Sequence, residues 1–363
     1  MNANVSSLSH LEPLPSLLQI YSPSGREGEA VAFLVEWMRG AGFQAYVDAA
    51  GNAVGVLDGG PQPDGSPPRE VVLLGHIDTV QGFIPVALRQ GRLYGRGAVD
   101  AKGPLAAFAV AAARVGARPG WRIVVVGAVE EESATSKGAR QAARDFHPTF
   151  AVIGEPSQWN RITLGYKGRL LLDYRYTRSL SHRAGPDIGA CEHAVAYWNS
   201  VAAWSASFNE GRERLFDRLL PSLRRFHSHD DGFSEVAEMT LGFRLPPDLT
   251  PAVLEERLQE LNRGAELRFY GGEQAYRCRR DTPLVRAFLA AIRAQGERPN
   301  FVLKTGTSDM NVVGPVWQCP LLAYGPGDSR LDHTPEEHVL AEEWRRGVDV
   351  LAHALSELTG SGL

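Results

Sequence analysis

The fold of this chain is decided by VVLLGHIDTV, residues 71–80. The apolar, β-branched start of this stretch is typical of a buried strand, which ends at a glycine, a histidine and an aspartate. Because side chains two positions apart on an extended chain point to the same side, His76 and Asp78 share one face. Such a pair suits a metal-bound imidazole that a neighbouring carboxylate orients. A core histidine with Asp78 capping the next turn explains this stretch equally well.

Helices and strands alternate around this stretch. Apolar residues at helical spacing predict a helix over 27–40, and an alanine-rich run from Pro104 to Ala117 predicts another. Further buried strands are predicted at 121–129 and 150–153. This order indicates an α/β domain with a mainly parallel sheet, whose strand ends gather side chains at one edge.

The pattern changes near Ile162. Residues 164–178 and 236–245 alternate apolar and polar side chains, as antiparallel strands do. The other elements expected in this part of the chain are helices at 190–208 and 251–262 and a strand at 265–270. The α/β pattern returns from Thr282. We therefore expect residues 1–162 and 282–363 to form one discontinuous α/β domain, and residues 163–281 to form a smaller inserted α+β domain.

Composition excludes several classes of protein. The 363 residues are 44% hydrophobic and 22% charged, as in ordinary soluble globular proteins. A formal net charge of -4 without charge blocks gives no sign of a nucleic-acid partner. No apolar run reaches the roughly 18 residues that cross a membrane, and no signal peptide is recognisable. Three scattered cysteines form no disulfide framework. We expect a cytoplasmic protein that binds neither nucleic acid nor membrane.

Side chains that bind metals cluster at the predicted strand ends and loops. They are His76, Asp78, Asp100, Glu130, Glu131, Glu132, Glu155 and His333. Two imidazoles with several carboxylates suit zinc, cobalt or manganese. Three consecutive glutamates after an apolar strand are hard to explain structurally, because burying unpaired carboxylates is costly. Two ions about 3.5 Å apart would need a bridging carboxylate and one further ligand pair each, which this set supplies.

These motifs resemble the co-catalytic metallopeptidase and aminoacylase family, which includes acetylornithine deacetylase, succinyl-diaminopimelate desuccinylase and glutamate carboxypeptidases. The resemblance extends from Ser22 to the last helix. Besides the glutamate pair, it rests on GHIDTV (75–80), GRGAVDAKG (95–103), GEP (154–156) and HTP (333–335). It implies a metallopeptidase catalytic domain with an inserted lid and dimerisation domain. It also implies two divalent metal ions, zinc or cobalt.

The resemblance assigns a role to each ligand. His76 and Glu155 would hold one ion, and Glu132 and His333 would hold the other. Asp100 would bridge the two ions, and Asp78 would orient His76.

The run of glutamates allows two registers. If Gly138 is the glycine that follows the family's glutamate pair, Glu131 is the general base and Glu132 the ligand. In the alternative register, Glu130 is the base and Glu131 the ligand. The base would take a proton from the attacking water and pass it to the departing amine.

The resemblance also implies residues that contact the substrate. His182, in SHRAGP (181–186), would donate to the oxyanion of the partner subunit in a homodimer, although Arg183 stands where small residues are usual. A solvated loop histidine is the alternative. Arg244 would grip a substrate carboxylate, for which a guanidinium is suited, or would be a surface arginine. Gly306 and Thr307 would line the substrate site.

Three further stretches resemble the LysK-type branch of the family: LGYKGR (164–169), KTGTSDMN (304–311) and YGPGDS (324–329). Members of this branch release lysine or ornithine from the C-terminal glutamate of a small acidic amino-group carrier protein. The resemblance implies a role in lysine biosynthesis that overlaps with arginine biosynthesis.

An acidic carrier would favour a basic rim on the enzyme. The candidates for that rim are Lys167, Arg169, Arg175, Arg178 and Arg183. The alternative functions are an N-acetylornithine or N-acetyl-lysine deacetylase, a carboxypeptidase, or an inactive amino-acid-binding homologue.

Overall fold

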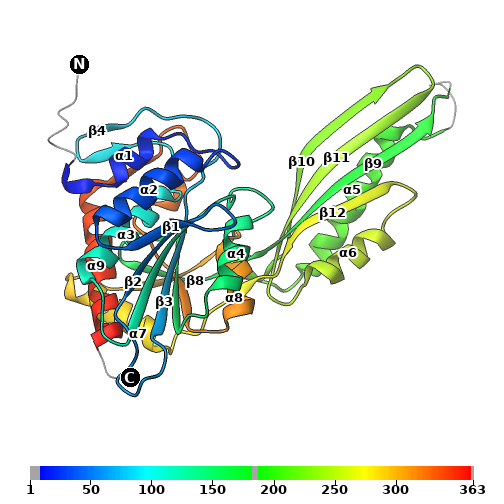
Figure 1. The fold of residues 1–363 in the computed structure, drawn as a ribbon. Helices are drawn as coiled ribbons and strands as arrows, with labels where there is room; N and C mark the ends of the chain where they lie inside the picture. The colour runs from blue at the N-terminus through cyan, green and yellow to red at the C-terminus, as the bar shows by residue number, and fades with distance from the viewer. Residues whose placement is uncertain (1–8, 182–186, 361–363) are drawn as a thin grey trace. The chain divides into compact units, whose positions relative to one another are not determined.

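The computed structural model describes residues 9–181 and 187–360 and divides the chain into two compact units (Figure 1). Unit 1 comprises Met1–Gly165, Cys278–Leu303 and Ser308–Leu363. Unit 2 comprises Tyr166–Arg277 and Lys304–Thr307. No helix within the described ranges combines the length and apolarity that a membrane span requires.

Unit 1 is built on a mixed sheet with the strand order β1-β2-β6-β3-β7-β15-β8, and β14 pairs with β8. These strands are β1 (Gln44–Val47), β2 (Ala53–Asp58), β3 (Arg69–His76), β6 (Trp121–Ala128), β7 (Phe150–Gly154), β8 (Arg161–Tyr166), β14 (Asn300–Lys304) and β15 (Leu321–Ala323). The central pairs of β3 with β6 and β7, and of β7 with β15, are parallel. The outer pairs β1–β2, β2–β6 and β15–β8 are antiparallel. The predicted α/β class is confirmed, and the parallel strands occupy the centre of the sheet.

Helices cover this sheet. They are α1 (Leu14–Gln19), α2 (Gly28–Gly40), α3 (Lys102–Val115), α4 (Lys137–Asp145), α7 (Pro283–Ala294), α8 (Asp309–Trp317) and α9 (Ala341–Gly360), with 3-10 turns at Ser9–Leu11 and Ser329–Leu331. Val71 and Leu73 of β3 pack in one hydrophobic cluster with α2, α3, α7 and α9. A smaller sheet, in the order β16-β5-β4, contains β4 (Ala87–Arg89), β5 (Arg92–Tyr94) and β16 (His338–Leu340).

Glycines at the ends of β3 and β7 allow the central strands to approach each other and α3. Gly75 pairs with Gly154. A Cβ on Gly154 would lie 2.9 Å from the Cα of Gly75 and 3.0 Å from the ring of Phe108 in α3. Any side chain at Gly154 would therefore push apart the strand ends from which the candidate ligands project.

Unit 2 is a four-stranded antiparallel sheet with two helices on one face (Figure 1). Its elements are β9 (Gly168–Ser179), α5 (Ala190–Phe208), a 3-10 turn (Leu215–Asp217), β10 (Leu220–Asp230), β11 (Ser234–Leu245), α6 (Pro251–Glu260), β12 (Glu266–Glu273) and β13 (Tyr276–Arg277). The sheet order is β10-β11-β9-β12. Leu170, Leu172 and Tyr174 alternate along β9 and face the helices, as the predicted period-2 pattern requires.

Two elements differ from the sequence analysis. Strand β10 lacks the apolar alternation that would reveal it, because it is an edge strand exposed from Ser222 to Asp230. Helix α8 begins after Ser308, whose hydroxyl accepts a hydrogen bond from the amide of Met310, and it tolerates Pro315. Its glycine and proline concealed the helical pattern.

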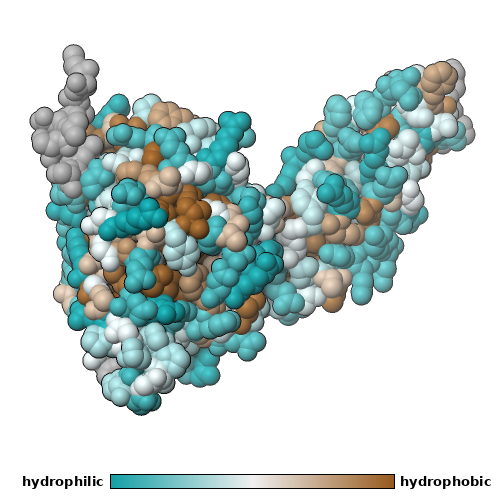
Figure 2. All heavy atoms as spheres, in the orientation of Figure 1, coloured by the Kyte–Doolittle hydropathy of each residue, from teal (hydrophilic) through white to brown (hydrophobic). Residues whose placement is uncertain are grey.

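Residues 304–307 lie in unit 2, whereas the sequence analysis placed them in the discontinuous α/β domain. The physical reason is a pair of hydrogen bonds at Thr307. Its hydroxyl donates to the carbonyl oxygen of Lys167 (3.0 Å) and accepts from Arg244 (2.6 Å). On the faces visible in Figure 2, hydrophobic residues are interspersed among hydrophilic ones in both units.

Candidate metal centre

The candidate ligands project from one edge of the unit 1 sheet. Strand β3 ends at His76, which pairs with Ala128 at the end of β6, and Glu155 directly follows β7. Since β3, β6 and β7 are parallel neighbours, their carboxyl ends meet at the same edge. The segment after β6 carries Glu131 and Glu132 to that edge. The loops before α3 and before β16 contribute Asp100 and His333.

Asp100 contacts both imidazoles with different oxygens. Its Oδ1 lies 3.2 Å from Nε2 of His76, and its Oδ2 lies 3.0 Å from Nε2 of His333. Nε2 of His333 is also 3.0 Å from Oε1 of Glu132. Ligand atoms of His76, Asp100 and Glu132 all lie within 4.8 Å of one another. One carboxylate between two imidazoles, each with room for a further acidic ligand, has the form of a bridged pair of cation sites.

Several carboxylates are buried close together, so that desolvation and mutual repulsion disfavour their charged forms. Burial, followed by repulsion from Asp100, raises the pKa of Glu155 well above its usual value. Burial also raises the pKa of Glu132, and it raises that of Glu131 well above the ordinary range. A divalent cation would relieve this repulsion, and the oxygen and imidazole donors match zinc or cobalt chemistry. The residues therefore fit a metal site.

The pKa values of the two histidines are raised as well, which in their case favours the charged form. Hydrogen bonds to Asp100 and Glu132 raise the pKa of His333 to about 10. For His76, burial opposes protonation, but hydrogen bonds with Asp100 and Asp78 outweigh it and raise the pKa well above its usual value. Although burial opposes ionisation of Asp100, its hydrogen bonds with the imidazoles hold its pKa well below the normal range.

Asp78 organises the site through both its backbone and its side chain. Its carbonyl oxygen accepts a hydrogen bond from Nδ1 of His76 (3.0 Å), which leaves Nε2 facing Asp100. Oδ1 lies 3.5 Å from the same Nδ1. The carboxylate also accepts hydrogen bonds from the amides of Glu131 and Glu132 (3.0 Å each) and from the hydroxyl of Ser24 (2.6 Å). Asp78 thus positions the glutamate pair as well as the imidazole.

The three consecutive glutamates point in different directions. Oε2 of Glu131 lies 4.0 Å from Nε2 of His76, and Glu132 contacts His333. Glu130 instead accepts a hydrogen bond from the hydroxyl of Thr135 (2.7 Å) and lies 3.8 Å from Nζ of Lys137. The geometry therefore directs Glu131 and Glu132, rather than Glu130, toward the imidazoles.

The candidate substrate residues are only partly covered by the described structure. Arg244 and Thr307 come together in unit 2, where Nη1 of Arg244 donates to the Thr307 hydroxyl (2.6 Å), and Gly306 adjoins them. The predicted oxyanion donor His182 lies outside the described residues, as does Arg183.

The prediction that Lys167 contributes to a basic rim is wrong. Its side chain is buried, and its Nζ donates to the carbonyl oxygens of Leu215, Phe216 (2.8 Å) and Arg218. Burial lowers the pKa of Lys167 to about 8. The ammonium group holds the turn before β10 in place and offers no charge to a partner.

Two residues that the sequence analysis did not assign also support the centre. Buried Lys102 donates to the carbonyl oxygens of Leu17 and Ile20 (3.1 and 2.6 Å), and so anchors the start of α3 next to Asp100. Buried Glu337 accepts hydrogen bonds from backbone amides around Asp100. In the sequence, each of these residues stands close to a candidate ligand: Lys102 two positions after Asp100, and Glu337 four positions after His333.

Comparisons with known proteins identify the family of this chain. Residues 72–357 match the model of peptidase family M20/M25/M40. A protein from Deinococcus radiodurans named [LysW]-lysine hydrolase is 47% identical over 357 residues, covering 96% of this chain and 97% of that protein. A Thermococcus kodakarensis protein, named putative [LysW]-lysine/[LysW]-ornithine hydrolase, is 40% identical and covers 98% of this chain and 94% of its own length.

Solved structures support the fold. An M20 family metallo-carboxypeptidase from Sulfolobus solfataricus superposes with a TM-score of 0.78 at 15% identity, over 97% of this chain and 100% of that one. An aminopeptidase PepT from Bacillus cereus superposes with a TM-score of 0.75 at 16% identity, over 97% and 98%. The family resemblance inferred from the motifs is thereby confirmed. The chain belongs to peptidase family M20/M25/M40 and is a hydrolase.

Proposed function

We propose that this hydrolase releases lysine, and also ornithine, from the C-terminal glutamate of a small acidic amino-group carrier protein. It would act in lysine biosynthesis and, through ornithine, in arginine biosynthesis. The observation that carries this proposal is the 47% identity over nearly full length to a protein named [LysW]-lysine hydrolase. Relatives named for both lysine and ornithine substrates, at 37–40% identity, support the wider specificity.

We propose two divalent ions, zinc or cobalt, as cofactors. His76 and Glu155 would hold one and Glu132 and His333 the other, with Asp100 as the bridge; the different contacts of the two Asp100 oxygens support this assignment. Bound there, the ions would acidify a shared water and polarise the amide carbonyl.

Glu131 is the proposed proton carrier. It would take the proton of the attacking water and deliver it to the nitrogen of the departing amine. Its buried position and raised pKa suit a carboxyl that must hold a proton between these two steps. Asp78 would keep it in position through the bond to its backbone amide (3.0 Å).

The remaining assignments concern substrate and assembly. Arg244, Thr307 and Gly306 would bind a carboxylate of the substrate, supported by the contact between Arg244 and Thr307. A homodimer through unit 2 would place His182 of one subunit at the oxyanion of the other. Strand β10 supports this assembly, because it is an exposed edge strand with only β11 as its neighbour in the described sheet.

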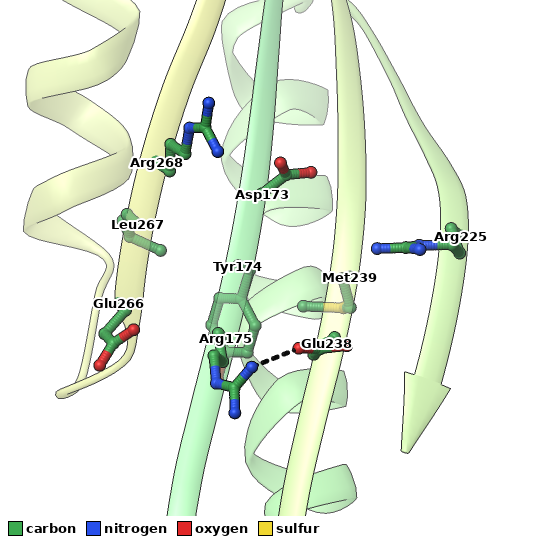
Figure 3. A pocket seen from close by; sticks show the side chains of 9 residues that line it. All are labelled: Asp173, Tyr174, Arg175, Arg225, Glu238, Met239, Glu266, Leu267 and Arg268. Carbon is green, nitrogen blue, oxygen red and sulfur yellow. Dashed lines mark hydrogen bonds and ion pairs between the residues drawn. The ribbon is translucent and has the colours of Figure 1, made fainter. Parts of the chain in front are cut away.

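The open face of unit 2 is the proposed docking surface for the carrier. We define this open face by the side chains opposite the helices: Asp173, Arg175, Arg225, Glu238, Glu266 and Arg268, which border a hollow of about 400 Å³ (Figure 3). Arg175 is paired with Glu238 (2.8 Å). Exposed Arg225 and Arg268 form no ion pair within the described chain, so their charges are available to an acidic partner.

The decisive experiment compares metal-loaded protein on carrier-linked lysine, carrier-linked ornithine and N-acetylornithine. We expect the carrier-linked substrates to be cleaved with much higher kcat/KM. Faster cleavage of N-acetylornithine would instead identify a deacetylase, and inactivity on every amide after zinc or cobalt loading would identify a binding homologue. We propose the cytoplasm as the location, in line with the three free cysteines.

A further inference from the structure

Glu337 is a buried carboxylate surrounded by donors from the loop that carries Asp100. Its Oε1 accepts hydrogen bonds from the backbone amides of Gly97 (3.0 Å), Val99 (3.0 Å) and Asp100 itself (3.1 Å). Its Oε2 accepts from Nη1 of Arg96 (2.8 Å). The Glu337 side chain is 1% exposed. Both oxygens are occupied by donors, so this carboxylate is not itself a metal ligand.

Arg96 extends the network to two more segments. Its Nε donates to the carbonyl oxygen of Gly82 (2.9 Å), and its Nη1 donates to that of Thr334 (3.2 Å). The ion pair therefore joins the loop after β3, the Asp100 loop and the segment that follows His333. All of these residues belong to unit 1.

This arrangement constrains the two loops that must meet at the metal centre. Asp100 and His333 come from segments more than two hundred residues apart, yet their side chains are 3.0 Å apart. The pairing of β5 with β16 brings the two segments together up to Tyr94 and His338, and the Glu337 side chain extends this connection to residues 97–100. A buried ion pair that is also hydrogen-bonded to the backbone on both sides favours one geometry, since losing a partner leaves a buried charge uncompensated.

We propose that Glu337, with Arg96, is a positioning residue that sets the orientation in which Asp100 would bridge the two proposed ions. It preorganises the backbone of residues 97–100 so that the two Asp100 oxygens face different imidazoles. Without it, the loop would still supply a carboxylate, but one free to bind a single ion. This inference rests on the proposed two-ion site and is independent of the carrier substrate.

The test variant is Glu337→Gln, which keeps the shape but replaces one acceptor oxygen with an amide that faces Arg96. The matched control is Asp231→Asn. Oδ1 of Asp231 likewise accepts backbone amides, from Phe233 (2.9 Å) and Ser234 (2.7 Å), but in the turn between β10 and β11 of unit 2. Both variants disturb a carboxylate that organises a loop, and only the first loop contains a proposed metal ligand.

The readout is cobalt binding, followed by visible absorption during chelator competition and by electron paramagnetic resonance of the two-cobalt form. We expect Glu337→Gln to lower the affinity for the more weakly bound cobalt ion by about 10- to 100-fold, the range typical of residues that orient metal ligands. We also expect it to reduce the magnetic coupling that a shared carboxylate provides. Asp231→Asn should leave both measurements unchanged.

Equal cobalt affinity and equal coupling in Glu337→Gln and the parent protein would overturn the proposal. If Glu337→Gln does not fold, Arg96→Met serves as a second variant, because it retains the three amide bonds to Oε1. It should lower cobalt affinity in the same direction and by less, and parent-like binding by folded Arg96→Met would likewise overturn the proposal. If the parent protein binds two magnetically coupled cobalt ions but does not cleave carrier-linked lysine, the proposed substrate is wrong and the two-ion site is not.

Discussion

Oδ1 of Asp78 accepts a hydrogen bond from the backbone amide of Glu131 at 3.0 Å, while Oδ2 accepts one from the amide of Glu132, also at 3.0 Å. One side chain thus links the position of a proposed metal ligand, Glu132, to the position of the proposed base. Metal binding and proton transfer should therefore fail together when this side chain is removed.

Asp78→Ala should lower both kcat and metal content. The substitution leaves the amides of Glu131 and Glu132 without their acceptor, at a cost of about 1–3 kcal/mol for each unsatisfied buried group. Amide hydrolysis and bound metal, measured on the same samples, check this expectation. Ser24→Ala, which removes a single donor to Asp78, is the control and should have a much smaller effect. Full metal content with normal kcat in Asp78→Ala would contradict the linkage.

Glu131→Gln should reduce kcat by about 10²- to 10⁴-fold, the range for loss of a general acid–base group, with metal content retained. Glu130→Gln should remain near parental activity, because Glu130 is held by Thr135 away from the imidazoles. Steady-state rates with metal analysis distinguish the two registers. If Glu130→Gln were the inactive variant, the register that makes Glu130 the base would be correct.

The metal-free protein should lose stability as pH rises from about 6.5 to about 10. Hydrogen bonds to Asp100 and Glu132 raise the pKa of folded His333 from 6.5 to about 10. The folded state therefore keeps a proton that the unfolded chain releases, and this stabilisation is complete below the unfolded pKa and is lost through the folded one. A bound cation replaces that proton, so zinc binding should release protons.

Thermal melts of chelator-treated and zinc-loaded protein across this pH range test the expectation. The Tm of the metal-free form should fall with pH more steeply than the Tm of the zinc-loaded form. His333→Ala removes the titrating group and should flatten the metal-free curve. A metal-free curve as flat as that of His333→Ala would show that this imidazole does not retain its proton.

Reversing the charges of Arg225 and Arg268 to glutamate should lower kcat/KM for carrier-linked lysine by at least about tenfold and leave N-acetyl-lysine cleavage unchanged. Both arginines are exposed on the open face, so an acidic carrier would lose attraction and meet repulsion. The effect should shrink at high salt. Reversal of Arg293 and Arg298, which are exposed on unit 1 and form no ion pair within the described residues, is the matched control. Equal losses on both substrates would argue against docking there.

Lys167 is unsuited to such a test. A glutamate at this buried position would face the carbonyl oxygens of Leu215, Phe216 and Arg218, so reversal would destabilise unit 2 itself.

The sequence by itself determined which segments form the α/β layer and which residues can bind metals. The run 71–74 is apolar because β3 lies between two parallel neighbours, and a strand buried on both faces is rich in apolar residues. The histidine and the acidic residues stand out because they follow apolar strands, where unpaired carboxylates are costly. Helix starts such as Thr282–Pro283 were equally readable, because capping is a local interaction.

Tertiary structure decided what depends on partners distant in sequence. Which oxygen of Asp100 faces which imidazole depends on a loop that Glu337 holds from more than two hundred positions away. Lys167 was expected on the surface, but the backbone at 215–218 accepts its hydrogen bonds and buries it. Strand β10 was not predicted, because an edge strand with exposed faces needs no apolar pattern. Local spacing cannot encode such contacts, since their energy arises only when the remote segments pack together.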